Sequence, residues 1–348
     1  YTHPLSSAAS DVYKRQVYRT RHHAWMHRFA CLLILLPASA VAADDYPADA
    51  FPLRSHNPVL QIFGLPAFRT HELVAPGNVD VALGYDVAND ADDADRATEV
   101  LIIDAETQTL TLSLRRRLGE RFEVGLDVPY VRYSGGYLDS VIYNFHNAVG
   151  LSNSQRDGPD DELRLLFAQD GGTFLDLSAP VSGIGDVQLS GAMKLGQITL
   201  RASLKAPTGD AEKLTGSGAL DASLGIHGGL TTRFLDRDLA LSAFAGVLAL
   251  GDGEVMPELQ RSAVPYAGAA ARWHLTPRLA VAAQLYAQGS YFDIDLDELG
   301  GSTFQLAFGG DYRFSTGGWM LRLAIAEDIA AAAAPDFALH LSIRRPSH

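Results

Sequence analysis

Apolar and polar side chains alternate along segments of roughly ten residues throughout this chain. Residues 197–206, QITLRASLKA, show the pattern, because every second residue from Ile198 onward is apolar and the residues between are Thr, Arg, Ser and Lys. Successive side chains of a β-strand point to opposite faces, so such a segment is a strand with one apolar and one polar face. Alternating segments of this length are typical of β-barrels that cross a membrane.

The connections between these segments alternate strictly between short and long. Short turns at one end and long loops at the other are typical of outer-membrane barrels. The tight turns are 117–121, 195–197, 234–238, 274–278 and 315–318. The longer polar connections are 89–97, 135–183, 207–216, 251–262, 293–302 and 328–335. This pattern predicts 12 strands: 77–89, 98–117, 120–134, 184–195, 197–206, 217–232, 238–250, 263–274, 278–291, 303–314, 318–327 and 336–345. A further hairpin within 161–178 would raise the strand number to 14.

A soluble β-sandwich is the main alternative, because its strands alternate in the same way and pack their apolar faces on each other. A sandwich gives no reason for connections of alternating length, nor for aromatic side chains at the strand ends. Aromatic rings favour the membrane–water interface, so we expect two aromatic girdles. The girdle beside the tight turns would consist of Phe122, Phe234, Trp273, Tyr312, Phe314 and Trp319. The girdle near the opposite ends would consist of Tyr266, Tyr291 and Phe292.

We therefore predict an all-β protein, a single transmembrane antiparallel up-and-down β-barrel of about 12 strands with one short helix in a long extracellular loop. The helix is expected within residues 137–151, YLDSVIYNFHNAVGL, whose apolar residues recur at helical spacing. It would fold over the barrel mouth as a lid, rest on the outer leaflet, or pack against neighbouring loops. The sequence leaves these three alternatives open.

The N-terminal region carries a targeting signal rather than part of the fold. Residues 26–43, MHRFACLLILLPASAVAA, combine a basic start, an apolar run and small residues, which indicates a cleaved secretory signal peptide. Residues 1–25 precede its Met, and we interpret them as non-native upstream translation. The predicted organisation is then an N-terminal periplasmic arm or plug over 44–76 and an outer-membrane barrel over 77–348, so the bacterial outer membrane is the expected location.

Charge and cysteine content exclude several classes of function. The formal net charge is −13, and residues 1–43 hold five of the 28 basic and one of the 41 acidic residues. The remaining acidic excess argues against nucleic acid as a partner, because phosphate binding needs a basic patch. Cys31 is the single cysteine, so no Cys-ligated metal or disulfide is expected. The segment DIDLDE (293–298) lacks the Gly and the final Glu of a calcium loop, and we predict no metal site and no cofactor.

Two motifs resemble an uncharacterised proteobacterial envelope family, the domain of unknown function 3187. The first is FPLRSHNPVLQIFGLPAFR (51–69), which is similar to a P-x-R-S-x-N-P run at the start of that family. The second is GIGDVQLSGAMKLG (183–196), which resembles a Gly-x-Gly-Asp strand opening found in outer-membrane barrels of that type. The resemblance covers the chain from about residue 51 and implies an outer-membrane barrel. It implies no substrate and no catalytic residue.

The segment 51–68 precedes the first predicted strand and contains three prolines, so it is not itself strand-like. One interpretation is a plug that enters the lumen from the periplasmic side, with Arg54, His56 and Asn57 bonding to charges on the barrel wall. The other is an ordered arm that packs against the base of the barrel. The sequence does not separate the two.

Charged side chains on the polar faces of the strands are expected to line the lumen. Ion pairs of this kind brace a narrow barrel, and we favour that interpretation over a selectivity-setting channel. The candidates are Asp80, Asp86, Glu123, Asp127, Asp186, Lys194, Arg201, Lys205, Asp221, Asp311, Arg313, Arg322 and Arg344.

These features predict passive passage or binding of a small solute, in contact with outer-membrane lipid and lipopolysaccharide. A structural envelope protein with a closed lumen is the first alternative. A lipid-acting barrel enzyme is a disfavoured second alternative, because His146 with Ser152 and Ser154 is the only nearby Ser–His combination and lies on a predicted helix and loop. We therefore expect no enzymatic activity and no catalytic residues.

Overall fold

The computed structural model describes residues 50–76, 79–96, 98–136, 163–328, 335 and 337–345. The predicted signal peptide and the predicted helix within 137–151 lie outside these residues. The described part forms one antiparallel sheet of 15 strands, and 12 of them close into a barrel. The fold class and the strand number predicted from the sequence are therefore confirmed.

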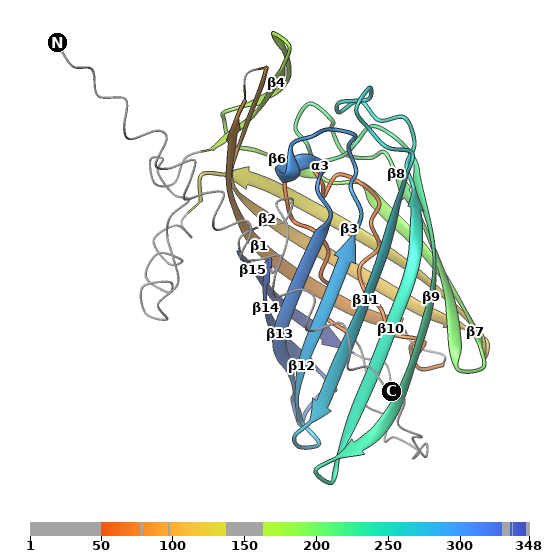
Figure 1. Cartoon of the computed structure of the whole chain (residues 1–348). Coiled ribbons are helices and arrows are strands. Elements are labelled where there is room, and N and C mark those ends of the chain that lie inside the picture. The colour runs from red at the N-terminus through yellow and green to blue at the C-terminus, as the bar shows by residue number, and fades with distance from the viewer. Residues whose placement is uncertain are drawn as a thin grey trace, which may run out of the picture. The chain divides into compact units, whose positions relative to one another are not determined.

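The ring of the barrel follows the order of the chain and closes between its first and last strands (Figure 1). Strands β1 and β15 pair from Val81 with Arg345 to Asn89 with Phe337. The 12 strands are β1 (Val79–Asp95), β2 (Glu99–Leu118), β3 (Phe122–Ser134), β7 (Val187–Leu195), β8 (Ile198–Ala206), β9 (Asp221–Phe234), β10 (Arg237–Ala249), β11 (Ala263–His274), β12 (Leu279–Gln288), β13 (Thr303–Arg313), β14 (Met320–Asp328) and β15 (Phe337–Arg345).

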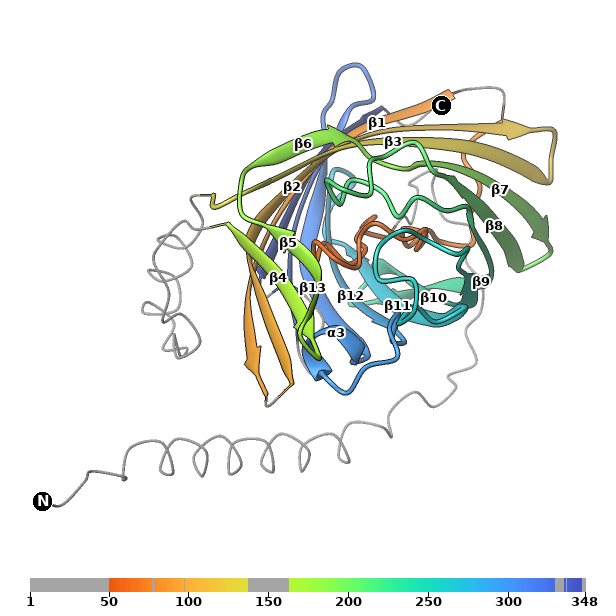
Figure 2. The same ribbon diagram turned by 90° about the horizontal axis from the view of Figure 1, so that it is seen from above.

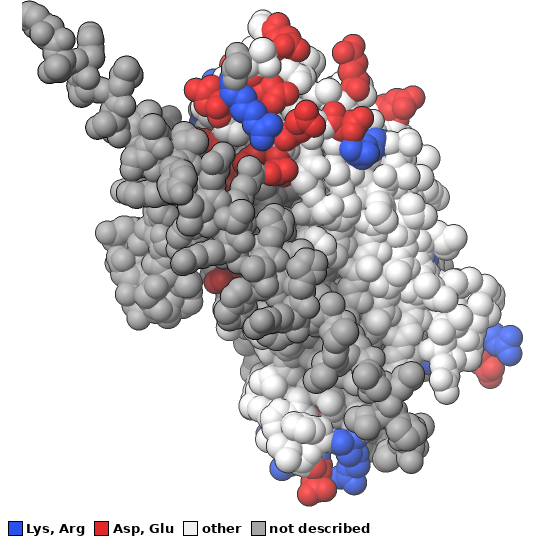
Figure 3. Space-filling view, viewed as in Figure 1, with Lys and Arg blue, Asp and Glu red and all other residues white. Residues whose placement is uncertain are grey.

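The outer face of the ring is apolar, as expected for a wall in contact with lipid. The outward side chains Leu204, Leu224 and Leu323 are each about half exposed, although leucine is usually a core residue. Figure 3 shows Lys, Arg, Asp and Glu gathered at the two ends of the visible described surface, with a band nearly free of them between. A contiguous apolar belt of this kind marks a surface that faces lipid.

Three shorter strands extend the wall at the end that carries the long loops, here called the long-loop end; the opposite end is the short-turn end. Strands β4 (Arg164–Gln169) and β5 (Gly172–Leu177) form a hairpin beside the upper part of β2, and β6 (Val181–Ile184) pairs with β3. The hairpin considered for residues 161–178 therefore exists, but it lies outside the ring. The barrel keeps 12 strands rather than 14.

The acidic connection expected over residues 89–97 is mostly strand. Residues Asn89–Asp95 continue β1, and they pair with Val100–Glu106 of β2. The prediction of a loop was wrong because the acidic residues interrupt the apolar face of β1, whereas their partner strand supplies the buried side chains Leu101 and Ile103. Water at the long-loop end can solvate carboxylates on a strand that extends beyond the lipid.

The aromatic girdle predicted beside the short turns exists, but the three residues predicted for the second girdle do not form one. Phe122, Phe234 and Trp319 are exposed there, and the rings of Phe234 and Trp273 meet edge to face at 5.6 Å. Tyr266, Tyr291 and Phe292, which we expected in a second girdle, are buried inside the barrel. Their assignment was wrong because, at the long-loop end, apolar residues fill the inside of the barrel as well as its outside.

Helical structure is minimal in the described residues. The single helix there is α3 (Asp297–Gly300), in the connection between β12 and β13. No helix in the described ranges is long and apolar enough to cross a membrane.

A charged side chain on the outer face should destabilise the barrel. The variant Leu323→Arg, in the middle of β14, is expected to lower the free energy of unfolding by about 2–4 kcal/mol, because it places a guanidinium in lipid. Leu235→Arg, in the exposed turn between β9 and β10, is the matched control and should change it by less than about 0.5 kcal/mol. Denaturant unfolding in lipid vesicles measures both, and equal effects would contradict a lipid-facing β14.

Candidate functional site

Residues 50–72, here called the lumen segment, run inside the barrel (Figure 2). The segment rises from the short-turn end, turns near residues 57–63 and descends again. On the way up, the carbonyl of Ala50 accepts a hydrogen bond from Arg322 of β14 at 2.6 Å. On the way down, the carbonyl of Arg69 bonds with His227 of β9 at 2.7 Å. The interior of the barrel is therefore filled by the chain's own N-terminal part.

Asn57 holds the top of the lumen segment. Its backbone carbonyl accepts hydrogen bonds from the amides of Leu60 and Gln61, and its side-chain oxygen accepts one from Val59. Its side-chain amide donates to Asp90 of β1 at 3.1 Å. Asparagine suits this position because its amide supports a local turn while it bonds to the wall.

Gly64 brings the descending arm of the segment close to the wall. Its amide donates to Asp221 Oδ2 at 2.8 Å, and its carbonyl accepts from Gln188 at 2.9 Å. A Cβ at this position would lie 2.9 Å from the Cβ of Asp221 and 3.0 Å from that of Lys205. Only glycine allows an approach this close, which explains the Gly within the motif QIFGLP.

Much of the long-loop half of the lumen is apolar, beside a buried charge cluster of Lys205, Asp186 and Asp221. The ring of Phe63 stacks on Tyr291 with centroids 4.9 Å apart, and Phe68 packs on Phe244 at 4.2 Å. Tyr133 of β3 donates its hydroxyl hydrogen bond to the carbonyl of Leu214. A continuous buried cluster therefore joins the lumen segment, the inner wall and the long loops.

The short-turn half of the lumen is filled with charge. Asp127 pairs with Arg115 at 2.6 Å, and Asp311 accepts from Arg322 at 2.6 Å while also pairing with Arg272. Near the edge, Asp80 accepts from Arg344 Nε at 2.7 Å. Side chains from nearby strands thus neutralise each other inside the ring.

Lys205 joins three strands to the lumen segment. Its ammonium lies 2.6 Å from Oδ2 of Asp186, the residue just before β7, and 3.1 Å from Asp221 of β9. It also donates to the carbonyl of Ile62 at 3.0 Å. All three charged side chains are buried, so each depends on the others for compensation of its charge.

A second set of ion pairs ties the descending arm to the short-turn end. Arg201 pairs with Glu123 at 2.8 Å and donates to the carbonyl of Thr70, and Lys194 pairs with Glu72 at 2.5 Å. The side-chain hydrogen bond from His71 is the main cause that lowers the pKa of Glu72 to about 2, and Lys194 adds to it against the opposing effect of burial. Glu72 therefore keeps its charge at any pH that a cell envelope meets.

The candidates named from the sequence have distinct surroundings in this arrangement. The predicted plug residue Asn57 contacts the wall, His56 lies 3.4 Å from Asp86, and the Arg54 side chain faces a cavity. Asp86 also bonds with His340 of β15 at 2.7 Å. Arg313 lies on the same face of β13 as Asp311, two residues away. The other candidates named as lumen-lining form the ion pairs described above.

Sequence reasoning missed several members of the site. Arg115 lies in a run of three arginines, which hides the alternation, and Arg272 lies in an Ala-rich segment with little polar contrast. Gln188 and Gln284, which bond to the lumen segment, are uncharged and gave no signal. Among the described residues, no group of three or more His, Cys, Asp or Glu side chains is arranged to hold a metal ion.

A closed 12-strand barrel with an apolar outer belt and a largely charged short-turn half of the lumen is the fold of bacterial outer-membrane barrels. One solved structure agrees at the level of the fold. The COG4313 outer membrane channel from Pseudomonas putida F1 superimposes with a TM-score of 0.51 and 16% identity, covering 79% of this chain and 97% of that one. The translocator domain of the autotransporter NalP from Neisseria meningitidis gives a TM-score of 0.43 and 11% identity, over 78% of this chain and 89% of that one.

The sequence itself places the chain in a family. Residues 27–345 match the family described as "Protein of unknown function (DUF3187)", and the chain belongs to it. The family resemblance expected from the motifs at 51–69 and 183–196 is therefore confirmed. No curated protein is significantly similar to the chain.

Removal of the Lys205 ammonium should destabilise the protein strongly. The variant Lys205→Met leaves the buried carboxylates of Asp186 and Asp221 without their cation, and we expect the free energy of unfolding to fall by about 3–5 kcal/mol. Lys213→Met is the matched control, because Lys213 forms an exposed ion pair with Asp210, and it should have no measurable effect. Denaturant unfolding in lipid vesicles measures both variants. Equal unfolding midpoints for the two variants would contradict the assignment.

Proposed function

We propose that this protein is an outer-membrane channel for small, predominantly apolar solutes, and that the lumen segment is its closure. The short-turn end then faces the periplasm and the long-loop end faces outward. The similar channel of Pseudomonas putida F1 agrees with a role in passage, although it shares only the fold.

The main support is that the wall of the barrel is complete without the lumen segment. In the backbone ladders of the described residues, the 12 strands of the ring pair with each other and with the extra strands β4 and β6. The lumen segment contributes no strand. A single β-bridge, between Pro76 and Arg117, joins the residues just after the segment to β2. The segment can therefore leave or shift without breaking the inter-strand hydrogen bonds that the membrane requires.

The surfaces that the segment covers indicate the class of solute. Phe63 and Phe68 cover Tyr291 and Phe244, and these rings would line the lumen if the segment moved. Apolar and aromatic walls with a few polar groups are typical of sites for small apolar molecules. The charges at this level, Lys205 with Asp186 and Asp221, are paired with each other.

A structural envelope protein with a permanently closed lumen is the second candidate. It is favoured by the buried ion pairs of Lys205 and Arg322, which hold the segment by its carbonyl groups. The lipid-acting enzyme has no support in the described residues, and the His146, Ser152 and Ser154 combination lies outside them.

A disulfide between the lumen segment and the wall separates the two candidates. In a Cys31→Ser background, Gly64→Cys with Asp221→Cys places two Cβ atoms 2.9 Å apart. A disulfide needs about 3.5–4.5 Å between its Cβ atoms, so it forms once the lumen segment moves away from β9 by about 1 Å. Uptake of the apolar dye 1-N-phenylnaphthylamine by intact Gram-negative cells that produce the variant is the measurement. Oxidised cells should take up dye at the rate of cells without the protein, and reduction should restore the rate of wild-type protein.

The single variants Gly64→Cys and Asp221→Cys, given the same treatments, control for the substitutions themselves. Equal uptake by the oxidised and reduced double variant, with both above the rate of cells lacking the protein, would contradict closure by the lumen segment. Wild-type uptake no faster than in cells without the protein would favour the structural candidate.

A further inference from the structure

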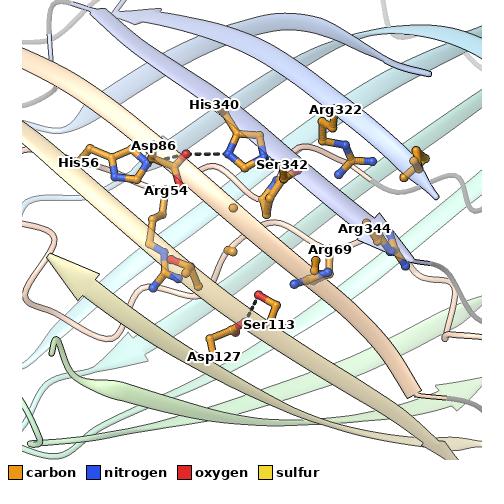
Figure 4. Close-up of a pocket in the computed structure, with 16 residues that line it drawn as sticks. Arg54, His56, Arg69, Asp86, Ser113, Asp127, Arg322, His340, Ser342 and Arg344 are labelled. Atoms are coloured by element: carbon orange, nitrogen blue, oxygen red, sulfur yellow. Dashed lines mark hydrogen bonds and ion pairs between the residues drawn. The ribbon is translucent and has the colours of Figure 1, made fainter. Parts of the chain in front are cut away.

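A cavity of about 50 Å³ lies in the short-turn half of the lumen, between the lumen segment and the wall formed by β1, β2, β3, β14 and β15. Figure 4 shows Arg54 on one side of it and Arg69 and Arg344 on the other, with Ser113 and Ser342 between. One water molecule needs about 10–15 Å³ of such space. The cavity therefore has room for a few waters or for one small polyatomic ion.

The lining of this cavity carries more positive than negative charge. Four arginines line it (Arg54, Arg69, Arg322 and Arg344) but only two aspartates (Asp86 and Asp127). Adding the ion-paired neighbours Arg115, Arg272, Asp80 and Asp311 gives six arginines and four aspartates. This local excess of two positive charges occurs in a chain whose formal net charge is −13.

Neither aspartate presents a bare carboxylate to the cavity. Asp127 pairs with Arg115 at 2.6 Å and accepts from Ser113 at 2.5 Å. Asp86 lies between two imidazoles, 2.7 Å from His340 Nδ1 and 3.4 Å from His56 Nε2. Repulsion of a bound anion by these two groups is therefore reduced.

Among the described residues, Arg54 has no direct ion-pair partner, and it interacts electrostatically with Asp127, which pairs directly with Arg115. Within the described part of the chain, no hydrogen bond or ion pair engages its guanidinium, and its side chain points into the cavity (Figure 4). A guanidinium stays charged at all physiological pH values and offers donors in a planar fork that matches an oxyanion. Arg54 is only partly buried, and a bound anion would supply its guanidinium with a direct counter-charge.

We propose that this cavity is a binding site for a small oxyanion, a carboxylate, phosphate or sulfate group, with Arg54 as its principal ligand. Arg69 and Arg344 supply the surrounding positive field, and the Ser342 hydroxyl supplies a further polar group. The site lies below the apolar half of the lumen. It requires the lumen segment in its seated position, and it does not depend on whether the barrel passes solutes.

Selenate is a suitable probe, because it is a small tetrahedral oxyanion whose selenium can be located in crystals by anomalous scattering. Wild-type protein should show an anomalous peak between Arg54 and Arg344, and replacement of chloride by selenate at constant ionic strength should raise its thermal unfolding midpoint. Arg54→Gln should lose the peak and bind about 10- to 100-fold more weakly, which is the effect of one charge-assisted hydrogen bond. Arg233→Gln, at an exposed arginine near the short-turn end of β9, is the matched control and should behave as wild type.

A parallel titration with acetate distinguishes the source of the oxyanion. Arg54-dependent binding of either anion supports the site, and the tighter of the two tells an inorganic ion from the carboxylate of a solute. An anomalous peak only at the outer loops, no peak in wild-type protein, or an equal midpoint shift in Arg54→Gln would each overturn the proposal. The wild-type crystal alone decides the question if Arg54→Gln does not fold.

Discussion

Every other feature of this protein depends on the requirement that backbone N–H and C=O groups find partners where no water is present. The pairing of β1 with β15 meets it, because that contact converts an open sheet with two edges into a ring without any. Once the ring is closed, alternation along each strand divides the side chains into a lipid-facing and a lumen-facing set. The outer belt and the contents of the lumen are both consequences of that division.

The lumen is divided along its axis as well, and the N-terminal segment spans both halves. In the apolar half its contacts are non-directional, such as Phe63 on Tyr291. In the charged half the wall arginines pair mainly with wall aspartates, and they hold the segment through carbonyl groups such as that of Ala50. The wall is thus braced independently of the segment, which separates the stability of the barrel from the position of the chain inside it.

The sequence allowed prediction of the ring but not of what happens at the long-loop end. The alternation of apolar and polar residues identified a strand wherever one face of the strand is in contact with lipid and the other with charged side chains, as in residues 198–206. Around Tyr266 and Tyr291 the inner face of the strands is apolar as well, so the sequence does not distinguish it from the lipid-facing side. The prediction therefore assigned these buried aromatic residues to an outer girdle. Arg115 and Arg272 were missed for a related reason, since their neighbours do not alternate in polarity. The sequence could not place Arg54 beside β1, β2 and β15, because the lumen segment has no periodic pattern from which its path could be predicted.

The long sequence separation of the contacts to the lumen segment has a consequence for the order of events during biogenesis. Phe51 bonds to Gln284, and Ala50 bonds to Arg322, so the earliest residues of the described chain wait for some of the latest. Contacts between residues so distant along the chain require closure of a long loop, and the entropy lost in that closure precedes any stabilisation from the contact. The lumen segment, which is synthesised before the strands of the ring, is consequently the last to reach its native neighbours, and a newly inserted barrel would pass through a hollow intermediate before it is filled.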